Sequence, residues 1–464
     1  MAELRLNELA ARMKGTVIRG NPERLFNAFG IDSRMTKPGE LFFAIRGLRD
    51  GQAFVADAQA KGASGAVVSA AEGFGPLDAD FALIRVADTT AALQNLASGV
   101  VKDYNPRVVG ITGSVGKTTT KEFTASLLGR KYRVLKSEGN FNNHLGLALS
   151  LLRLEREHQV AVLEMAMSAA GEIRLLTRIA PPDIAVITNI NPVHLAFFDS
   201  LKAIAQAKKE ILDGAKKSAK AVLNADDPLV TDMAKGFRGD TIAFGLSEGC
   251  VIRAESITFQ GLDGLRFTLK YGSRRAEIRL PFLTEGYLQN FLAACGAAYA
   301  MTLGLEEIVA RSAELKPFSR RGSVHRLSRG IVLVDDSYNS NPRALATALR
   351  GLGRLSSKRK IAVLGDMLEL GPQETEFHIQ AGQETVAAGW QWLVTVGPLC
   401  RSAARAARQA GLDPGHVLSF DDADEASRAI PAMLRPEDLV LVKGSHGMRM
   451  DKIADSILEA FKES

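Results

Sequence analysis

The chain has 464 residues, of which 46% are hydrophobic and 24% charged, and its formal net charge is +6. This composition is typical of globular proteins, and the length predicts about three domains. No run of 18 apolar residues occurs, and the amino terminus lacks the apolar core of a signal peptide. The three cysteines do not have the spacing of a metal site, and the basic residues are scattered without interleaved aromatics. We therefore expect a cytoplasmic protein that spans no membrane and binds no nucleic acid, and whose mild positive charge suits small polyanionic substrates.

The first block of the chain, residues 1 to about 105, predicts a small α/β module. Its short apolar runs, at 41–45 and 65–68, are separated by polar turns. Asn105 precedes a proline, and a residue in that position avoids helix, so we place the first domain boundary there.

The segment 108–119 has the pattern of a phosphate-binding loop. An apolar strand leads into a glycine-rich turn, and Lys117-Thr118-Thr119 opens a helix. Glycines let backbone N–H groups approach an anion closely, and the helix N-terminus adds partial positive charge. We expect Lys117 to reach the terminal phosphates of a nucleotide and Thr118 to hold Mg²⁺. The first glycine is Gly110, one residue earlier than in the strict P-loop spacing.

Strands and helices alternate from 106 to 317, which predicts a central domain with a mainly parallel sheet. Buried strands are expected at 160–163, 184–187 and 221–223. Glu164 directly follows the first of these strands, where an unpaired buried carboxylate would be expensive. Two interpretations stay open: an ion pair with a nearby Lys or Arg, or a Mg²⁺ ligand that faces the phosphate loop.

Further polar positions of the central block are candidates. His194 lies beyond a sheet strand. A histidine near Mg²⁺ suggests either a second metal position or a contact with the residues that bind the metal directly. Lys208 lies on the apolar stripe of a helix that Ser200 is expected to cap, and this pattern alone favours a lysine that snorkels to solvent. Asn140 and Asn143 lie in a polar turn before an apolar helix, which is a weak signal because asparagine is common in turns.

From 318 to 464, strand patterns alternate with helical ones, which predicts a Rossmann-like domain. The expected strands are 331–334, 361–364, 393–396, 417–420 and 439–442, and the helical patterns include 342–352, 401–410 and 448–461. Polar segments at 335–341, 365–371 and 443–447 follow three of these strands and are therefore expected to share one rim of the sheet, a second binding face. Asn341 before Pro342 predicts a helix cap, but that cap does not explain the acidic residues and the tyrosine just before it. Those residues are candidate contacts to a ribose or a cation.

Taken together, these motifs resemble the Mur ligase family over nearly the whole chain. The segments that carry the resemblance are 32–34, 39–42, 50–51, 112–119, 139–143, 164–165, 188–194, 207–208, 335–342, 365–371 and 443–445. Two runs, 335–339 and 365–371, indicate the branch that adds a dipeptide. The family implies an α/β fold of three domains: a small α/β N-terminal domain at 1–105, a P-loop central domain at 106–317 and a Rossmann-like C-terminal domain at 318–464.

The resemblance implies an ATP-dependent amide ligase of peptidoglycan precursor synthesis. Its substrates would be UDP-N-acetylmuramoyl-tripeptide and D-alanyl-D-alanine, joined through an acyl-phosphate intermediate with ATP and two Mg²⁺ positions. The N-terminal domain would hold the UDP-sugar end, and the C-terminal domain would bind the incoming dipeptide and close over ATP. We expect a monomer.

The same resemblance implies the roles of individual residues. The catalytic residues would be Lys117, His194 and Lys208. Metal would be held by Thr118, Glu164, His194 and Lys208, with Lys208 carbamylated and so converted from a cation into a carboxylate-like ligand. ATP would be bound by Gly113, Ser114, Gly116, Lys117, Thr118, Thr119, Asn290, Arg321 and Asp336. The other substrates would be bound by Ser33, Arg34, Asn140, Asn143, Asn339 and Asn341.

The chain departs from the family at two places, and two other functions compete with the ligase prediction. Asn290 alone remains of a Gly-x-His-Asn-x-x-Asn motif, and Gln52 stands where relatives often have histidine. One rival is an amide ligase of the same architecture that adds a single amino acid or acts as a folylpolyglutamate synthase, which the run 335–339 disfavours. The other rival is a nucleotide-dependent switch, which needs only the phosphate loop and mobile segments and leaves the metal candidates unexplained.

Overall fold

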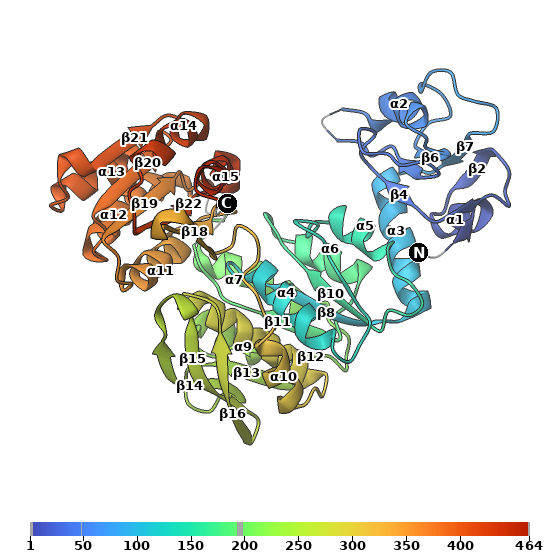
Figure 1. Cartoon of the computed structure of the whole chain (residues 1–464). Helices are drawn as coiled ribbons and strands as arrows, with labels where there is room; N and C mark the ends of the chain where they lie inside the picture. Colours follow the sequence, from blue (N-terminus) through green and yellow to red (C-terminus); the bar gives the residue numbers. More distant parts are fainter. Residues whose placement is uncertain (1–2, 48, 193–197, 463–464) are drawn as a thin grey trace.

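The computed structural model describes residues 3–47, 49–192 and 198–462, and the fold contains three main β-sheets. We call the parts around them the N-terminal module (3–104), the central module (107–315) and the C-terminal module (318–462). In Figure 1 the N-terminal and C-terminal modules lie on opposite sides of the central one. The expected α/β fold with a mainly parallel central sheet is confirmed.

The N-terminal module is built on a five-stranded sheet with one antiparallel edge strand. Its strand order is β2 (Thr16–Arg19), β7 (Ala82–Arg85), β6 (Gly65–Val68), β5 (Leu41–Phe43) and β4 (Phe29–Gly30), beside a small ladder of β1 (Leu4–Arg5) and β3 (Leu25–Phe26). Its helices are α1 (Leu6–Arg12), α2 (Val55–Ala60) and α3 (Thr89–Tyr104).

Helix α3 joins the N-terminal module to the central one. Asp88 caps the helix by accepting the Thr90 and Ala91 N–H groups, and Asn105 ends it in the left-handed conformation. The apolar face of α3 packs on α1 of its own module and on α5 (Gly146–Leu151) and α6 (Glu172–Ile179) of the next. The two modules therefore share one continuous hydrophobic core.

The central module contains a nine-stranded sheet. Its order is β16 (Arg274–Leu280), β15 (Leu265–Tyr271), β14 (Ile252–Phe259), β13 (Thr241–Gly245), β12 (Lys220–Asn224), β11 (Ile184–Ile187), β8 (Arg107–Thr112), β10 (Val160–Glu164) and β9 (Val134–Lys136). The seven strands from β14 to β9 are parallel, and β15 and β16 extend the sheet beyond β14 through antiparallel pairings. The remaining helices are α4 (Lys117–Leu128), α7 (Leu201–Asp213), α8 (Pro228–Ala234), α9 (Glu285–Ala300) and α10 (Leu305–Ser312).

The C-terminal module confirms the five predicted strand-then-helix repeats. Its sheet order is β17 (Ser323–Arg326), β18 (Val332–Asp336), β22 (Asp438–Lys443), β19 (Arg359–Gly365), β20 (Trp392–Val396) and β21 (Val417–Phe420), and only β17 is antiparallel to its neighbour. The helices are α11 (Pro342–Gly353), α12 (Glu374–Ala387), α13 (Arg401–Gln409), α14 (Ala423–Met433) and α15 (Asp451–Ala460).

Local signals explain where α7 and α11 begin. Ser200 caps α7 by accepting the Ala203 N–H, and Asn341 caps α11 by accepting the Ala344 N–H. Both caps were predicted, as was Pro342 in the first turn of α11. The predicted domain boundaries stay predictions; they fall between α3 and β8 and between α10 and β17.

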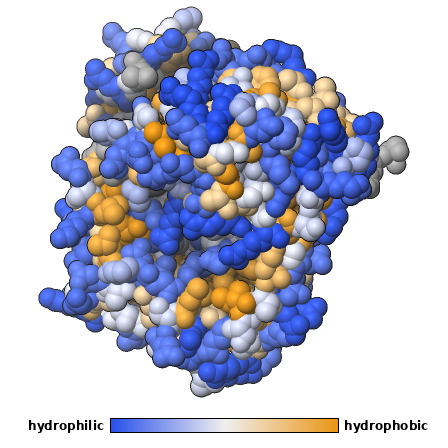
Figure 2. Space-filling model, turned by 90° about the vertical axis from the view of Figure 1, so that its left-hand side faces the viewer, coloured by the Kyte–Doolittle hydropathy of each residue, from blue (hydrophilic) through white to orange (hydrophobic). Residues whose placement is uncertain are grey.

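The surface is mixed in character. The face shown in Figure 2 is mostly hydrophilic with apolar patches dispersed over it, as is normal for a folded protein. Within the described ranges, none of the helices combines the length and apolar character needed to cross a membrane.

Candidate active site

A cavity of about 740 Å³ lies between the central and C-terminal modules. It is located beyond the carboxyl ends of the parallel strands of both sheets, where open α/β sheets bind ligands. Predicted site residues that line it are Ser114, Gly116, Lys117, Thr118, Thr119, Asn140, Asn143, Glu164, Asn290, Arg321, Asp336, Asn339 and Asn341. The structure thus brings together residues from widely separated segments of the chain.

The glycines of the loop are required by close contacts and by backbone conformation. Gly113 has φ +147°, and a Cβ there would lie 1.9 Å from the Thr188 hydroxyl oxygen. Gly116 has φ +87°, and a Cβ there would lie 2.0 Å from Oδ1 of Asn290. Asn290, on α9, is therefore packed directly against the loop.

We expect Gly116→Ala to lower the free energy of unfolding by about 1–3 kcal/mol, because the left-handed conformation strains a residue with a Cβ. The clash with Asn290 should add to that cost and should raise the KM for ATP. Gly171→Ala is the matched control, since Gly171 precedes α6 with φ +88° and a Cβ there would meet nothing within 4 Å. Denaturant unfolding and ATP kinetics would check this; equal behaviour of the two variants would show that Asn290 contributes nothing.

The loop is held from the side by the segment that follows β11. The Thr188 hydroxyl and the Asn189 amide both donate to the Val115 carbonyl, at 2.7 and 3.0 Å. The Val115 N–H donates to Oδ1 of Asn189 at 2.9 Å. The Asn191 N–H donates to the Ser114 hydroxyl at 2.8 Å, and that hydroxyl donates to the Asn191 carbonyl at 3.1 Å. These contacts fix the loop before any anion arrives.

Lys117 lies folded over the loop. Its Nζ donates to the carbonyls of Gly113, at 2.9 Å, and Ser114, at 3.1 Å. Burial lowers the pKa of Lys117; the Glu164 carboxylate opposes that shift and the Arg321 guanidinium adds to it. An incoming polyanion would favour the charged ammonium form of Lys117, which burial disfavours.

Glu164 is buried, with 2% of its surface exposed, and it is bonded to neutral donors. The Thr118 hydroxyl donates to Oε2 at 2.7 Å, and the Asn142 amide donates to Oε1 at 2.9 Å. The Glu164 N–H donates to the Ser137 hydroxyl at 3.2 Å. Within the described residues no cation pairs with this carboxylate, so the ion-pair interpretation finds no support. A buried carboxylate beside a threonine hydroxyl offers the oxygen ligands that Mg²⁺ prefers, and the residues fit such an ion.

Lys208 does not snorkel, so the interpretation from its helical pattern alone is wrong. The side chain is 1% exposed, and its Nζ makes no hydrogen bond or ion pair with any residue in the described ranges. Burial, followed by the charge of Lys117, lowers the pKa of Lys208 well below its ordinary value. Its helix, α7, packs on β8 and β11 of the central sheet and on α6 and α8, which accounts for the burial of the side chain.

His194 lies outside the described residues, so the structure does not place it.

Arg321 connects the C-terminal module to the phosphate loop. Its Nη2 donates to the Thr118 hydroxyl at 3.2 Å, and its guanidinium lies 4.0 Å from the centre of the Tyr338 ring. The Tyr287 hydroxyl donates to the Arg321 carbonyl. This cation is therefore positioned from both modules, next to the hydroxyl predicted to hold Mg²⁺.

Asp336 is already engaged by a lysine. Lys443, at the end of β22, is 3% exposed, and its Nζ lies 2.6 Å from Oδ2 of Asp336. The same Nζ donates to the Asn339 carbonyl at 2.9 Å. Asp336 lines the cavity, but this ion pair also gives it a structural role in shaping the loop that follows β18.

Several residues that line the cavity were not predicted as site residues, among them Arg343 and Asn191. Arg343 donates to Oδ1 of Asn191 at 2.7 Å and so joins α11 to the segment that holds the phosphate loop. A cation in the first turn of a helix opposes the helix dipole, and that anomaly is a signal that could have identified Arg343. Asn191 carried no comparable signal.

Ser33 and Arg34 lie in the N-terminal module and do not line this cavity. Arg34 is exposed and pairs with Asp32 at 2.7 Å, and its hydrogen bonds lower the pKa of Asp32 to about 2. Gly113 and Lys208 also lie outside the cavity lining, although Gly113 directly precedes Ser114, which forms part of it.

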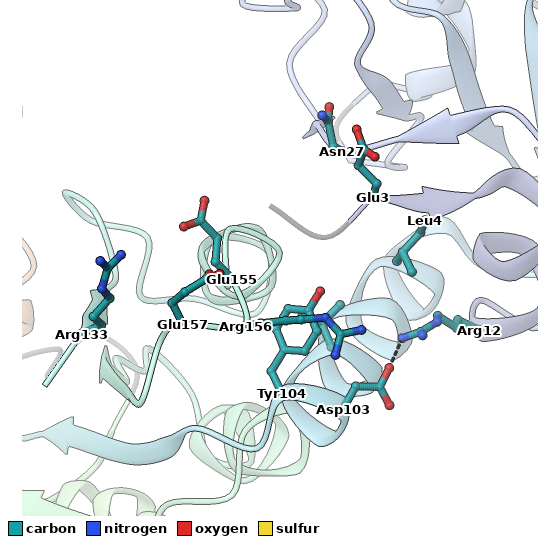
Figure 3. A pocket seen from close by; sticks show the side chains of 11 residues that line it. Glu3, Leu4, Arg12, Asn27, Asp103, Tyr104, Arg133, Glu155, Arg156 and Glu157 are labelled. Carbon is teal, nitrogen blue, oxygen red and sulfur yellow. Dashed lines mark hydrogen bonds and ion pairs between the residues drawn. The ribbon is translucent and has the colours of Figure 1, made fainter.

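A second pocket, of about 1000 Å³, lies near the end of α3 (Figure 3). Its lining mixes both charges: Arg12 pairs with Asp103 at 2.5 Å, and Arg156 lies 5.5 Å from the centre of the Tyr104 ring. It contains none of the predicted site residues.

Two family models match the chain over the modules that form the cavity. Residues 111–298 match the Mur ligase middle domain, and residues 320–446 match the Mur ligase, glutamate ligase domain. The chain belongs to the Mur ligase family.

Its full-length relatives have a more specific name. A protein of Bacillus subtilis (strain 168) is 32% identical over 463 residues, which is 99% of each chain. A protein of Escherichia coli (strain K12) is 32% identical over 438 residues, covering 93% of this chain and 94% of its own. Both are named UDP-N-acetylmuramoyl-tripeptide–D-alanyl-D-alanine ligase.

Solved structures are similar over nearly the whole chain. MurF from Acinetobacter baumannii has a TM-score of 0.89 at 29% identity and covers 99% of both chains. MurF ligase from Thermotoga maritima, solved in complex with ADP, has a TM-score of 0.81 at 28% identity and covers 93% of this chain and 97% of its own.

Proposed function

We propose that this protein is an ATP-dependent ligase that joins D-alanyl-D-alanine to UDP-N-acetylmuramoyl-tripeptide in peptidoglycan precursor synthesis. The observation that carries the proposal is the geometry at Thr118 and Glu164. A buried carboxylate without a cationic partner among the described residues is bonded to the hydroxyl that follows the phosphate-loop lysine. The names of the full-length relatives support the choice of substrates.

The reaction would begin with activation of the tripeptide. An oxygen of its terminal carboxylate attacks the γ-phosphorus of ATP, the bond from that phosphorus to the ADP oxygen breaks, and an acyl phosphate forms. The neutral amine nitrogen of D-alanyl-D-alanine then attacks the acyl carbon, the bond from that carbon to the phosphate oxygen breaks, and the nitrogen loses one proton to solvent and keeps the other as the amide N–H. The product is an amide, with ADP and phosphate released.

The chain's cations would counter the main obstacle, which is the approach of an anionic carboxylate to a polyanion. Lys117, now bonded to loop carbonyls, would turn to the terminal phosphates, and Arg321 would face the same region from the C-terminal module. Fixed charges placed where negative charge develops usually supply the largest catalytic contribution.

Thr118, Glu164 and Lys208 would hold Mg²⁺ together with His194. When bound, the ion would neutralise phosphate charge and polarise the transferred group. We propose that Lys208 is carbamylated, since a neutral buried amine reacts with CO₂ to give a carboxylate-like group. Its complete burial without an acidic partner among the described residues supports this modification, because an unpaired ammonium there is costly.

We propose that the three modules divide the substrates. Ser33 and Arg34 would contact the UDP-sugar end, whereas the C-terminal module would hold the dipeptide next to Asn339 and Asn341 and close over ATP. Asn140 and Asn143 would contact the tripeptide. Holding the reactants in this way contributes up to about 7–11 kcal/mol in ideal geometry.

The test is phosphate release from ATP by the purified protein, measured with each substrate omitted in turn. We expect release only when ATP, UDP-N-acetylmuramoyl-tripeptide and D-alanyl-D-alanine are all present, with one phosphate per amide formed. Dependence on a free amino acid in place of the dipeptide would identify another amide ligase. Phosphate release without any acceptor would contradict ligase chemistry and favour a nucleotide switch.

A further inference from the structure

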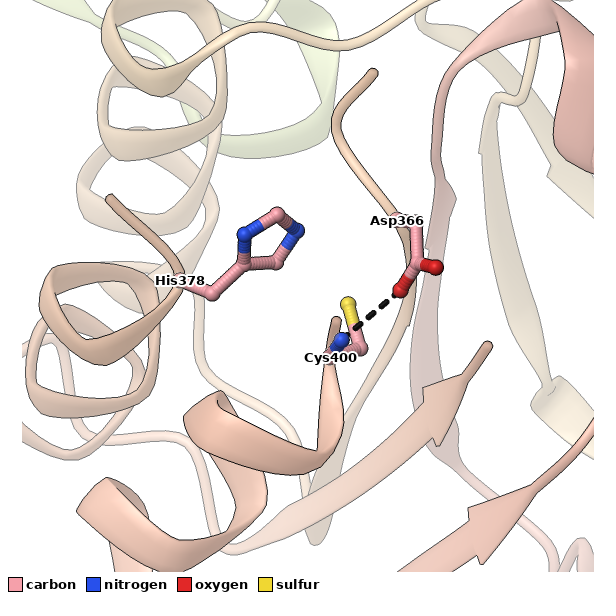
Figure 4. Close-up of side chains that lie close together, drawn as sticks. All are labelled: Asp366, His378 and Cys400. Atoms are coloured by element: carbon pink, nitrogen blue, oxygen red, sulfur yellow. Dashed lines mark hydrogen bonds between the residues drawn. The ribbon is translucent and has the colours of Figure 1, made fainter. Parts of the chain in front are cut away.

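Three buried side chains of the C-terminal module, Asp366, His378 and Cys400, lie close together (Figure 4). Possible ligand atoms of Asp366, His378 and Cys400 all lie within 4.8 Å of one another, and each residue is at most 2% exposed. Asp366 begins the segment 366–370, which we call the wall loop. Leu368, Glu369 and Leu370 of this loop line the cavity.

The trio has the composition of a metal site, but its histidine is fully engaged by the protein. The Met367 N–H donates to Nε2 of His378 at 3.0 Å, so this nitrogen acts as an acceptor. Nδ1 lies 2.6 Å from the Glu374 carbonyl oxygen, which can only accept. The ring is therefore neutral, with its proton on Nδ1, and neither nitrogen offers a lone pair to a metal.

Asp366 and Cys400 are engaged in the same way. The Asp366 carboxylate accepts the Cys400 N–H at 2.7 Å and the Leu399 N–H at 3.3 Å, at the start of α13. Burial, the charge of Asp366 and a hydrogen bond to it raise the pKa of the Cys400 thiol well above its ordinary value. Burial and the Asp366 carboxylate thus both favour the thiol over the thiolate that a metal ligand would be.

The hydrogen bonds of the trio hold the wall loop in one conformation. Met367 is 1% exposed, so His378 supplies a buried N–H with its acceptor. The next N–H, of Leu368, donates to the Ser445 hydroxyl at 2.9 Å. Glu369 then adopts φ +63°, which a residue with a side chain enters only when its surroundings impose it. Two consecutive amides are thus fixed immediately before the strained residue.

We propose that His378 is a positioning residue: its neutral imidazole holds Met367 and thereby places Leu368, Glu369 and Leu370 where the incoming dipeptide docks. The dipeptide's location rests on the proposed function, which puts it next to Asn339 and Asn341 in the cavity that the wall loop also lines. His378 itself touches no substrate, since Met367 lies between it and the cavity lining. Without His378 the Met367 N–H would be buried and would have no hydrogen-bond acceptor. A movement of the wall loop that lets water accept this N–H would then lower the free energy of the protein.

The test uses His378→Leu, which fills similar space but cannot accept a hydrogen bond. We expect the Met367 and Leu368 amides to exchange hydrogen about tenfold faster in the free protein, while the amides of β19 do not change. The KM for D-alanyl-D-alanine should rise about five- to tenfold, with the KM for ATP and kcat within about twofold of the parent. His378→Gln, whose side-chain oxygen can accept the Met367 N–H, should recover most of both effects.

Cys400→Ala is the matched control, because it removes a member of the trio but leaves the acceptors of the Met367 and Leu368 amides, His378 and Ser445, in place. We expect it to leave amide exchange and the KM for the dipeptide unchanged. If His378→Leu does not fold, His378→Met provides a second apolar replacement of similar volume.

Two results would overturn the proposal. One is a His378→Leu protein with a lower melting temperature but with parental amide exchange and parental KM values, which would make His378 a packing residue only. The other is stoichiometric Zn²⁺ binding by the parent that is lost in Cys400→Ala, which would make the trio a metal site. Because exchange is measured without substrates, it decides the role of His378 even if the parent does not use D-alanyl-D-alanine.

Discussion

Replacing Lys117 by alanine is expected to lower kcat by about 100- to 1,000-fold while leaving the melting temperature close to that of the parent. The ammonium is placed at the phosphate loop, and its hydrogen bonds to residues that the structure describes go to the carbonyls of Gly113 and Ser114. Burial already disfavours its charge, so the folded state loses little when the group is removed. The transition state loses a fixed cation at the point where negative charge develops. Steady-state kinetics and thermal unfolding, measured on the same preparation, separate these two effects.

Lys102→Ala is the matched control, since Lys102 is an exposed lysine of α3 outside the cavity lining. It should keep parental kinetics. Parental ATP turnover by Lys117→Ala would show that the phosphate-loop assignment is wrong.

Replacing Lys208 by alanine is expected to lower kcat by roughly 100-fold or more, because the variant loses a proposed carboxylate-like metal ligand. Short carboxylic acids such as formate or acetate should restore part of the activity by entering the vacated space. Turnover measured against acid concentration would check the rescue. The buried position of Lys208, with no acidic partner in the described part of the chain, is the physical reason for this expectation.

Two control variants test whether the rescue by carboxylic acids is specific to Lys208. Lys209→Ala changes the adjacent lysine, which is partly exposed and pairs with Asp213 at 3.6 Å, and should leave kcat unchanged. Lys117→Ala should not respond to the same acids, because its loss is that of a cation. Full activity of Lys208→Ala without added acid would argue against any catalytic role for Lys208.

Features with a local sequence signal were predicted well. Ser200 and Asn341 were identified as caps because a helix cap depends on one side chain and the next few N–H groups. The glycine-rich turn before Lys117 was recognised because its pattern is likewise contained in a few consecutive residues. The five strand–helix repeats of the C-terminal module followed from continuous apolar runs, which mark buried parallel strands.

Features that depend on tertiary contacts could not be predicted from pattern. The position of Lys208 on the apolar stripe of α7 is compatible with a side chain that snorkels to solvent and with one that is buried. Only the packing of α7 decides between the two. The strands β14 to β16 were missed because their half-buried alternation is weaker than the signal of a buried strand. The contact of Arg343 with Asn191 and that of His378 with Met367 join segments whose meeting no local pattern encodes.

The most direct test of the central claim is a structure of the protein with a non-hydrolysable ATP analogue and Mg²⁺. The account predicts that the terminal phosphates contact the N–H groups of residues 113–118 and Nζ of Lys117, and that the Thr118 hydroxyl and the Glu164 carboxylate bind the metal. A nucleotide bound elsewhere, or a Glu164 carboxylate that turns away from any metal, would contradict it.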